Sequence, residues 1–337
     1  MFVWAACILW LVLLLIPFLP GIRELRRPRD AAPLFVDMEY TKDPRYFGKS
    51  FRSVIRKYLD ADLHQQELRK VPLTRQEETL VSPSRTVPAG GKFNQILCIS
   101  GDLMSGEGAH FRKEVYASGK AILGSDTVMQ AVAVDGALML GSHATVMRWA
   151  DAGEAAEVGD GCTIGVSVSS RGELRIAPGC RFRRLYGSPI VTGSTDERSQ
   201  TEAYGLSGGA VGKRTMVRDV SSVPGGTTIE SDLIVKNNLR IANHCTIAGN
   251  VKTYKGLIIG EHVTVTGNIF SEDDITIGEH AVIEGNVFCQ GRVIIRGDAQ
   301  IGQFGKVKSV IGKRSVLIGR NVRVHGYVLT EGEGMVL

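Results

Sequence analysis

Three consecutive rows of eighteen residues decide the fold of this chain. They read IANHCTIAGNVKTYKGLI (241–258), IGEHVTVTGNIFSEDDIT (259–276) and IGEHAVIEGNVFCQGRVI (277–294). Each row places aliphatic residues in two columns that lie six positions apart, as in Ile241 and Ile247. A histidine column starts at His244, and a Gly-Asn column starts at Gly249. The repeat is therefore a property of whole rows and not of one residue type.

A period of eighteen residues is typical of one turn of a β-solenoid. Short strands in such a turn alternate inward aliphatic with outward polar side chains, and Gly or Asn suits corners that need a positive φ. The apolar spacing near 3.6 that a helical domain would show is absent. We predict an all-β fold, a single-stranded parallel β-helix with about 18 residues per coil. Stacked coils lie about 4.8 Å apart, so we expect the Asn column to form a hydrogen-bonded ladder.

The same repeat occurs earlier in the chain in a degraded form. Leu123, Leu140, Val158 and Ile176 follow one another at intervals of 17, 18 and 18 residues. We therefore predict a degenerate solenoid half over 92–192 and a regular half over 228–330, with about five or six coils in each. The polar, glycine-rich residues 193–227 read as a loop or linker, and 331–337 as a tail.

The amino terminus has the composition of a membrane anchor. Residues 1–22 carry no charged side chain, and about 20 helical residues span the hydrocarbon core of roughly 30 Å. A cleaved signal peptide would need a basic residue before the apolar run and a small-x-small site after it, and both are missing. The positive charges follow instead, in RELRRPR (23–29). We predict a single-pass anchor in the cell inner membrane, with the amino terminus outside and the bulk of the chain cytoplasmic.

Residues 23–91 read as a basic juxtamembrane segment. Residues 23–57 hold ten Lys or Arg side chains and five acidic ones. The net charge of this segment, +5, equals that of the whole chain. The remaining body is neutral, so nucleic acid is excluded as an expected partner. Tyr46–Leu59 has the pattern of a basic amphipathic helix, whose apolar side would lie either on an anionic leaflet or against the following domain. Residues 60–91 read as linker.

The composition excludes disorder and a disulfide framework. Of the 337 residues, 43% are hydrophobic and 22% charged, which is close to the globular average. Forty glycines and few aromatic residues suggest many tight turns around a thin aliphatic core. The six cysteines form no C-x-x-C pair, so we expect reduced thiols. These are Cys7, Cys98, Cys162, Cys180, Cys245 and Cys289.

The second half resembles the bactofilins, bacterial polymer-forming cytoskeletal proteins. The resemblance rests on the rhythm of aliphatic, Gly and polar residues in IGEHVTVTGNIFSEDDITIGEHAVIEGNVFCQGRVIIRGDAQIG (259–302), about one third of the chain with its flanks. It implies a right-handed parallel β-helix that assembles end to end, without nucleotide, into filaments near the membrane. The first solenoid half and the anchor depart from the compact plan of that family.

The chain also resembles, more weakly, the hexapeptide-repeat acyltransferases, which are left-handed β-helices with an aliphatic residue at every sixth position. Residues 241, 247, 259 and 265 obey that rule, but positions 253, 271 and 289 hold Thr, Ser and Cys. An eighteen-residue coil with one weak side fits the bactofilin pattern better. The residues alone leave the handedness open.

We identify no catalytic, cofactor-binding or metal-binding residue. His244, His262 and His280 are the sharpest candidates, as a general base or as Zn²⁺ ligands, but a column that repeats with the corner indicates a corner-filling role. Asp273-Asp274 reads as an exposed turn. A phosphate-binding loop and a G-x-S-x-G nucleophile motif are absent from the sequence.

Three functions follow as hypotheses. The first is a membrane-anchored, bactofilin-like scaffold that binds itself, the membrane and envelope-related proteins. The second is an acyltransferase acting on an envelope sugar or lipid precursor, and the third is a non-polymerising membrane adaptor. A short tail follows the last coil at Leu317–Leu329, so we expect that end to be thinly capped and to stack on another copy.

Overall fold

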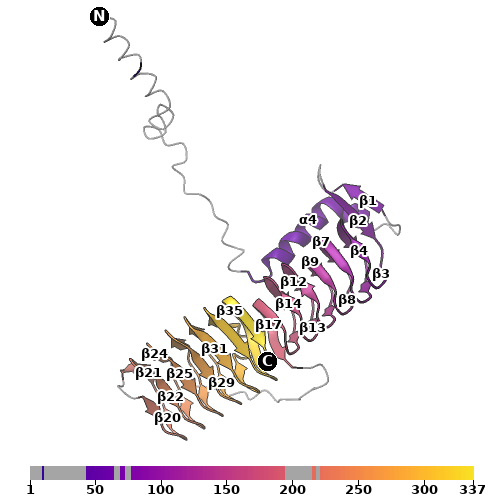
Figure 1. Ribbon diagram of the computed structural model, residues 1–337. Coiled ribbons are helices and arrows are strands. Elements are labelled where there is room, and N and C mark those ends of the chain that lie inside the picture. The colour runs from indigo at the N-terminus through magenta and orange to yellow at the C-terminus, as the bar shows by residue number, and fades with distance from the viewer. Residues whose placement is uncertain (1–9, 11–42, 64–68, 73–76, 194–214, 218–220) are drawn as a thin grey trace, which may run out of the picture. The chain divides into compact units, whose positions relative to one another are not determined.

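The computed structural model describes Trp10 and residues 43–63, 69–72, 77–193, 215–217 and 221–337. The predicted anchor at 1–22, apart from Trp10, and much of the loop at 193–227 lie outside this set. Residues 43–337 form one compact unit, an all-β solenoid of about 13 turns with a spacing of about 18 residues (Figure 1). The predicted all-β solenoid and its repeat of about 18 residues are confirmed. Within the described part of the chain, the structure contains no helix with the length and apolarity needed to span a membrane.

Each coil of the first half contributes to three faces, which we call A, B and C. Face A contains β2 (Glu78–Ser82), β5 (Ile96–Ile99), β7 (His110–Ala117), β9 (Val128–Val134), β12 (Trp149–Ala152), β15 (Ser167–Ser170) and part of β17 (Arg181–Thr192). Face B contains β3 (Arg85–Val87), β6 (Leu103–Ser105), β8 (Ala121–Leu123), β10 (Leu138–Leu140), β13 (Ala156–Val158) and β16 (Leu174–Ile176). Face C contains β4 (Lys92–Phe93), β11 (Thr145–Val146), β14 (Thr163–Ile164) and the first residues of β7, β9 and β17.

The second half repeats this arrangement. Face A contains β18 (Thr215–Val217), β21 (Asp232–Val235), β24 (Val251–Thr253), β27 (Ile269–Ser271), β30 (Val287–Cys289), β33 (Lys308–Gly312) and the middle of β35 (Arg323–Val336). Face B contains β19 (Ser222–Val223), β22 (Leu239–Ile241), β25 (Leu257–Ile259), β28 (Ile275–Ile277), β31 (Arg292–Ile295) and β34 (Ser315–Ile318). Face C contains β20 (Thr228–Ile229), β23 (Thr246–Ile247), β26 (Thr264–Val265), β29 (Val282–Ile283) and β32 (Gln300–Ile301).

The inward columns pair in parallel from coil to coil, and their side chains form the core. Ile259 pairs with Ile277, and both are at most 1% exposed, as is Ile283 in the next column. Burying one such side chain contributes about 1.5–3 kcal/mol. Thr253 and Ser271 of the weak column are also fully buried, and both hydroxyls donate to the carbonyl oxygen of Lys255. The turn that follows Thr253 therefore satisfies both hydroxyl groups.

One corner of every coil requires a left-handed backbone. The corner between faces B and C holds Gly90, Gly108, Asp126, His143, Gly161 and Gly179 in the first half, and Gly226, His244, His262, His280, Asp298 and Asn321 in the second. Their φ values lie between +53° and +74°. Gly, Asn, Asp and His are the residues that tolerate this region best.

The solenoid begins earlier than the boundary at residue 92 that the sequence suggested. Residues 60–91 were expected to be linker, but β2 and β3 lie in this segment and pair in parallel with β5 and β6. Val81 and Val87 are buried there. The prolines and charges around these short strands mask their alternation. β1 (Arg69–Pro72) pairs antiparallel with β2 at this end.

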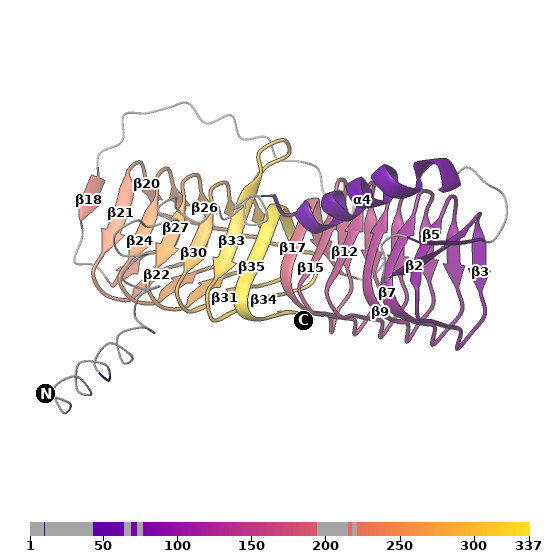
Figure 2. The ribbon, with the colours of Figure 1, turned by 90° about the horizontal axis from the view of Figure 1, so that it is seen from above.

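The two halves meet through their last coils. β17 pairs antiparallel with β35, so that Leu185 lies opposite Val328 and Phe182 opposite Gly334 (Figure 2). Leu185 and Val328 are fully buried, and one hydrophobic cluster extends from Val87 to Val336 through both halves. The expectation that the last coil ends in a thinly capped, open edge is therefore wrong. The edge is covered by the same chain.

Candidate functional site on the shared face of the two halves

Face A is one continuous sheet across the junction. β15 pairs with β17, β17 with β35, and β35 with β33. The strands are parallel within each half and antiparallel where the halves meet. Face A therefore offers two neighbouring surfaces of the same architecture, and the outward side chains decide what each can bind.

In the first half, face A is covered by the helix α4 (Tyr46–Leu63). Asp43 and Pro44 precede it, and the Asp43 carboxylate accepts a hydrogen bond from the Arg45 amide, which is typical of a helix start. Ile55 is fully buried, and the ring of Phe51 meets that of Trp149 edge to face at 5.8 Å. The outward residues beneath the helix are Val81, Ile96, Cys98, Tyr116, Ala131, Ala133 and Trp149.

This contact decides between the two interpretations of the amphipathic segment. Its apolar side, with Phe47, Phe51 and Ile55, packs on the solenoid and not on a lipid leaflet. The helix also continues four residues beyond the predicted end at Leu59. Lys49 and Arg56 remain on its solvent side, with side chains that are 57% and 63% exposed.

A buried carboxylate holds the start of α4. Asp151 on β12 is fully buried and accepts hydrogen bonds at 2.8 Å from both Nε and Nη2 of Arg45. It also pairs with Arg52 and accepts a bond at 2.6 Å from the Ser169 hydroxyl. The hydrogen bonds to Asp151 raise the pKa of Arg45. A Cβ on Gly48 would lie 2.4 Å from the Cβ of Asp151, so residue 48 of the helix must be a glycine.

A second carboxylate extends the network. Asp135 accepts a hydrogen bond of 2.6 Å from Arg52 Nε and another of 2.7 Å from the Tyr116 hydroxyl. Burial, followed by the bond to Asp135, raises the pKa of Tyr116. This cluster was not predicted from the sequence. The sequence does contain a signal for it. Asp151 has an outward position on its strand but lies between Trp149 and Ala152, whereas an aspartate on a solvent-facing strand would have polar neighbours.

Among the described residues, no helix lies on the same face of the second half, because α4 packs on strands of the first half, chiefly β2, β5, β9 and β12. One outward column of this face consists of partly exposed residues that pair from each coil to the next: Ile234, Lys252, Phe270, Phe288 and Ile311. The rings of Phe270 and Phe288 stack at 5.3 Å, and the Lys252 ammonium lies 5.3 Å from the Phe270 ring centroid. The ring stacking and the cation–π contact both stabilise the packing of neighbouring coils.

The predicted ladders lie at the corners of the second half. Asn250, Asn268 and Asn286 bond from coil to coil, with each side-chain oxygen accepting from the amide of the next residue in the column at 2.9 Å. His244, His262 and His280 are exposed at the left-handed corner, with ring centroids 5.0 and 4.7 Å apart. No group of three or more His, Cys, Asp or Glu among the described residues is arranged to hold a metal ion. The positive φ of all three histidines, +53° to +61°, gives the predicted corner role a geometric basis.

Two further predicted features can be located. Asp273 and Asp274 are exposed in a turn, where Asp274 accepts a hydrogen bond from the Arg292 amide at 2.7 Å. The five described cysteines are free and buried: Cys98, Cys162, Cys180, Cys245 and Cys289. Burial raises the pKa of Cys98 to about 12 and that of Cys289 to about 11, so these two thiols stay protonated at neutral pH.

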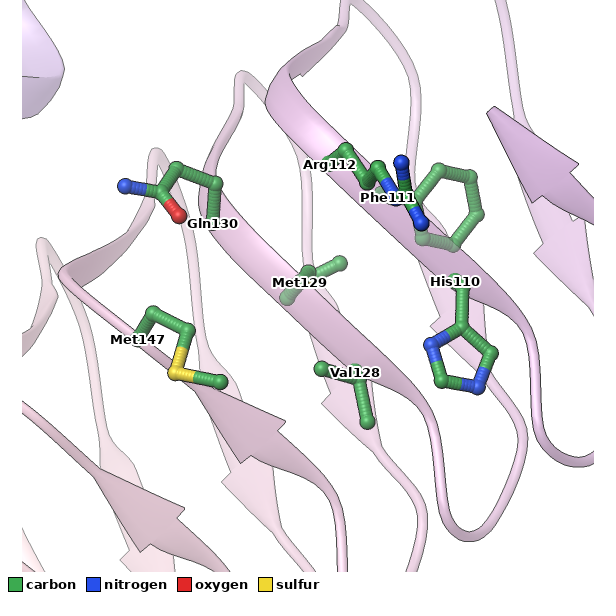
Figure 3. Close-up of a pocket in the computed structure, with 7 residues that line it drawn as sticks. All are labelled: His110, Phe111, Arg112, Val128, Met129, Gln130 and Met147. Carbon is green, nitrogen blue, oxygen red and sulfur yellow. The ribbon is translucent and has the colours of Figure 1, made fainter. Parts of the chain in front are cut away.

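A shallow cavity of about 270 Å³ lies on the first half where β7 bends (Figure 3). It is lined by His110, Phe111, Arg112, Val128, Met129, Gln130 and Met147. His110 is exposed, and the residues of its column in neighbouring coils are Lys92 and Val128, so it is not part of a histidine ladder. His110 was not predicted as a candidate, because one histidine in a degenerate repeat belongs to no motif.

Face A therefore combines a helix held by a buried ion network with a partly apolar surface that no described helix covers, while the histidines and asparagines stack from coil to coil at the corners. This arrangement is suited to binding and positioning a partner molecule. His110 is the side chain beside the cavity with the chemistry of a general base. In comparison with known proteins, the chain matches no family model, no curated protein and no solved structure.

Proposed function

We propose that this chain is a membrane-anchored structural protein of the bactofilin type, which self-assembles through its β-helix at the cytoplasmic face of the inner membrane. One observation carries the proposal: the β17–β35 junction, where two coil ends of this solenoid join through backbone pairing. It supports the idea that such ends are adhesive. The uncharged residues 1–22 and the basic residues that follow support the membrane location.

The ends available for assembly are the starts of the two halves. Val223 and Ile229 in the first coil of the second half are 5% and 7% exposed, whereas their partners Ile241 and Ile247 in the next coil are fully buried. β1 pairs with the first coil of the other half, and Lys70 and Pro72 on it disfavour further strand addition. We therefore favour the β18–β20 end as the assembly surface.

Electron microscopy and sedimentation of the full chain in detergent, without nucleotide, test this function. We expect linear polymers or end-to-end dimers. Ile229→Lys places a charge at the end and should give smaller species, whereas Thr228→Lys, at an exposed outward position of the same strand, should not. Circular dichroism controls for folding. A chain that stays monomeric at micromolar concentration would refute self-assembly and favour the adaptor.

The second candidate function is an acyltransferase of the hexapeptide type, and the position of His110 favours it. A single histidine beside a cavity is where a general base for acyl transfer would lie. The test is acyl-coenzyme A turnover with envelope sugar or lipid acceptors. Turnover that His110→Ala abolishes, while assembly and folding persist, would place the enzyme ahead of the scaffold.

A further inference from the structure

One insertion interrupts the regular coils of the second half. Ile259, Ile277 and Ile295 follow one another at eighteen residues, but Ile318, which pairs with Ile295, comes twenty-three residues later. The five additional residues form the loop Gln303–Val307, between β32 on face C and β33 on face A. Figure 2 shows a loop projecting from the body beside β33. The solenoid core does not need this loop, so its side chains are free to serve another purpose.

Among the residues whose exposure the structure describes, the loop carries the most exposed apolar side chain. Phe304 is 83% exposed and Val307 61% exposed, whereas the most exposed apolar residues on the flat faces, Met147 and Ile258, reach 52% and 49%. Exposing a phenylalanine to this degree leaves most of its apolar surface in water, which costs free energy that a binding partner would recover.

The stretch of sequence that contains the loop carries charge of one sign. Residues 299–314, AQIGQFGKVKSVIGKR, contain no acidic residue and four cations: Lys306, Lys308, Lys313 and Arg314. The body of the chain beyond residue 57 is neutral overall, so this run is a local excess. A protruding apolar tip between cations suits the interface of an anionic bilayer, where the ring enters the headgroup region and the ammonium groups stay with the phosphates.

The backbone holds the tip in place. Lys306 donates a hydrogen bond from its amide to the Gln303 carbonyl at 3.1 Å, and the Gly302 amide bonds to Ile283 on the neighbouring coil at 2.7 Å. Gly305 at the turn has φ +77°, and a Cβ there would have no atom within 4 Å. The tip is therefore a fixed, convex projection, and a convex shape favours a lipid surface over a protein ligand that needs a groove.

We propose that the loop 303–307 is a lipid-contact element, which inserts Phe304 and Val307 into the interface of an anionic membrane. The proposal rests on the membrane location inferred above and assigns a second contact far along the chain from the anchor. It would orient the solenoid on the bilayer, since one corner of face A then faces the lipid.

A fluorescent reporter on the full chain tests the contact. An environment-sensitive dye is attached at Val307→Cys in a Cys7→Ser background, in which the remaining cysteines are buried. The matched control carries the dye at Ile258→Cys, which is exposed on face B of the same half. Both proteins are reconstituted from detergent into vesicles of phosphatidylcholine with phosphatidylserine, with and without brominated acyl chains.

We expect a blue shift and loss of emission to brominated lipid for the dye at 307 and neither for the dye at 258. Lys306→Glu with Lys308→Glu should abolish the response at 307 with little change in the melting temperature, because Lys306 is an exposed loop residue and Lys308 is partly exposed at the start of β33. Equal responses at the two sites would overturn the proposal. A blue shift at 307 that appears before vesicles are added and grows with protein concentration would also overturn it, because a second copy would then cover the loop.

Failure of the anchor is a separate outcome. If the chain leaves the vesicles in an alkaline wash, the proposed anchor is wrong. In that case vesicles are added to the purified protein, and the responses of the dyes at 307 and 258 are compared. This measurement still decides whether the loop binds lipid.

Discussion

The two halves share one coil plan but differ in how well the sequence repeats. In the second half, outward residues face copies of themselves in the next coil, as in the Asn268 ladder, the His262 stack and the Phe270–Phe288 pair. In the first half, outward residues of face A face a helix whose sequence is unique, so Trp149 and Asp151 have no reason to recur. A degraded repeat therefore can indicate a face that another element covers, and does not by itself indicate a less regular solenoid.

The largest expected effect comes from separating the halves at their junction. Val328→Lys buries an ammonium opposite Leu185 and should cost about 3 kcal/mol or more. If the shared core couples the halves, the wild-type chain should unfold in one transition and the variant in two. Differential scanning calorimetry decides this. Two transitions already present in the wild type would contradict the coupling.

Removing the anchor of α4 should weaken only the first half. Asp151→Ala removes the carboxylate that binds Arg45 and leaves Arg52 with Asp135 alone, and should cost about 3 kcal/mol. Asp273→Ala, at an exposed turn of the second half, should change stability by less than about 0.5 kcal/mol. Hydrogen exchange should locate the loss at α4, β9 and β12. Equal protection in both proteins would show that the helix is held by apolar packing alone.

Breaking one rung of the Asn ladder tests the second half. Asn268→Ala removes the acceptor for the Asn286 amide and side chain, both at 2.9 Å, and should cost about 1 kcal/mol because the site is partly hydrated. Thr266→Ala, at an exposed position of the same coil, serves as the control. Urea denaturation measures both. A cost at Asn268 no larger than that at Thr266 would mean that water replaces the ladder.

The smallest effect is expected at the histidine corner. His262→Ala loses two ring contacts but keeps the backbone, and should cost about 1 kcal/mol or less. His262→Gly should cost no more than the alanine variant, because glycine relieves the strain of φ +53°. Chemical denaturation compares the two. Loss of biological function with folding and assembly intact would instead favour a catalytic role for this column.

The ladder columns were predictable because each row is a copy of the last. Ile259, Ile277 and Ile283 were assigned to the core from spacing alone, and the structure buries all three. The network of Asp151, Arg45 and Arg52 was not predictable in the same way, because its members are about one hundred residues apart and occur once. Periodicity reports contacts between neighbouring coils and carries no information about a single long-range contact.

The sequence by itself determined the coil: its length, its inward columns and the corners that need a positive φ, because these depend on residues within one row and the next. Only the tertiary structure decided that the last coils of the two halves join, that α4 packs on face A and that Val328 is buried. Those outcomes depend on how the chain reverses between the halves, which the repeat does not encode. The sequence of a strand edge does not show whether the edge is buried or open, because that depends on the surface that covers it.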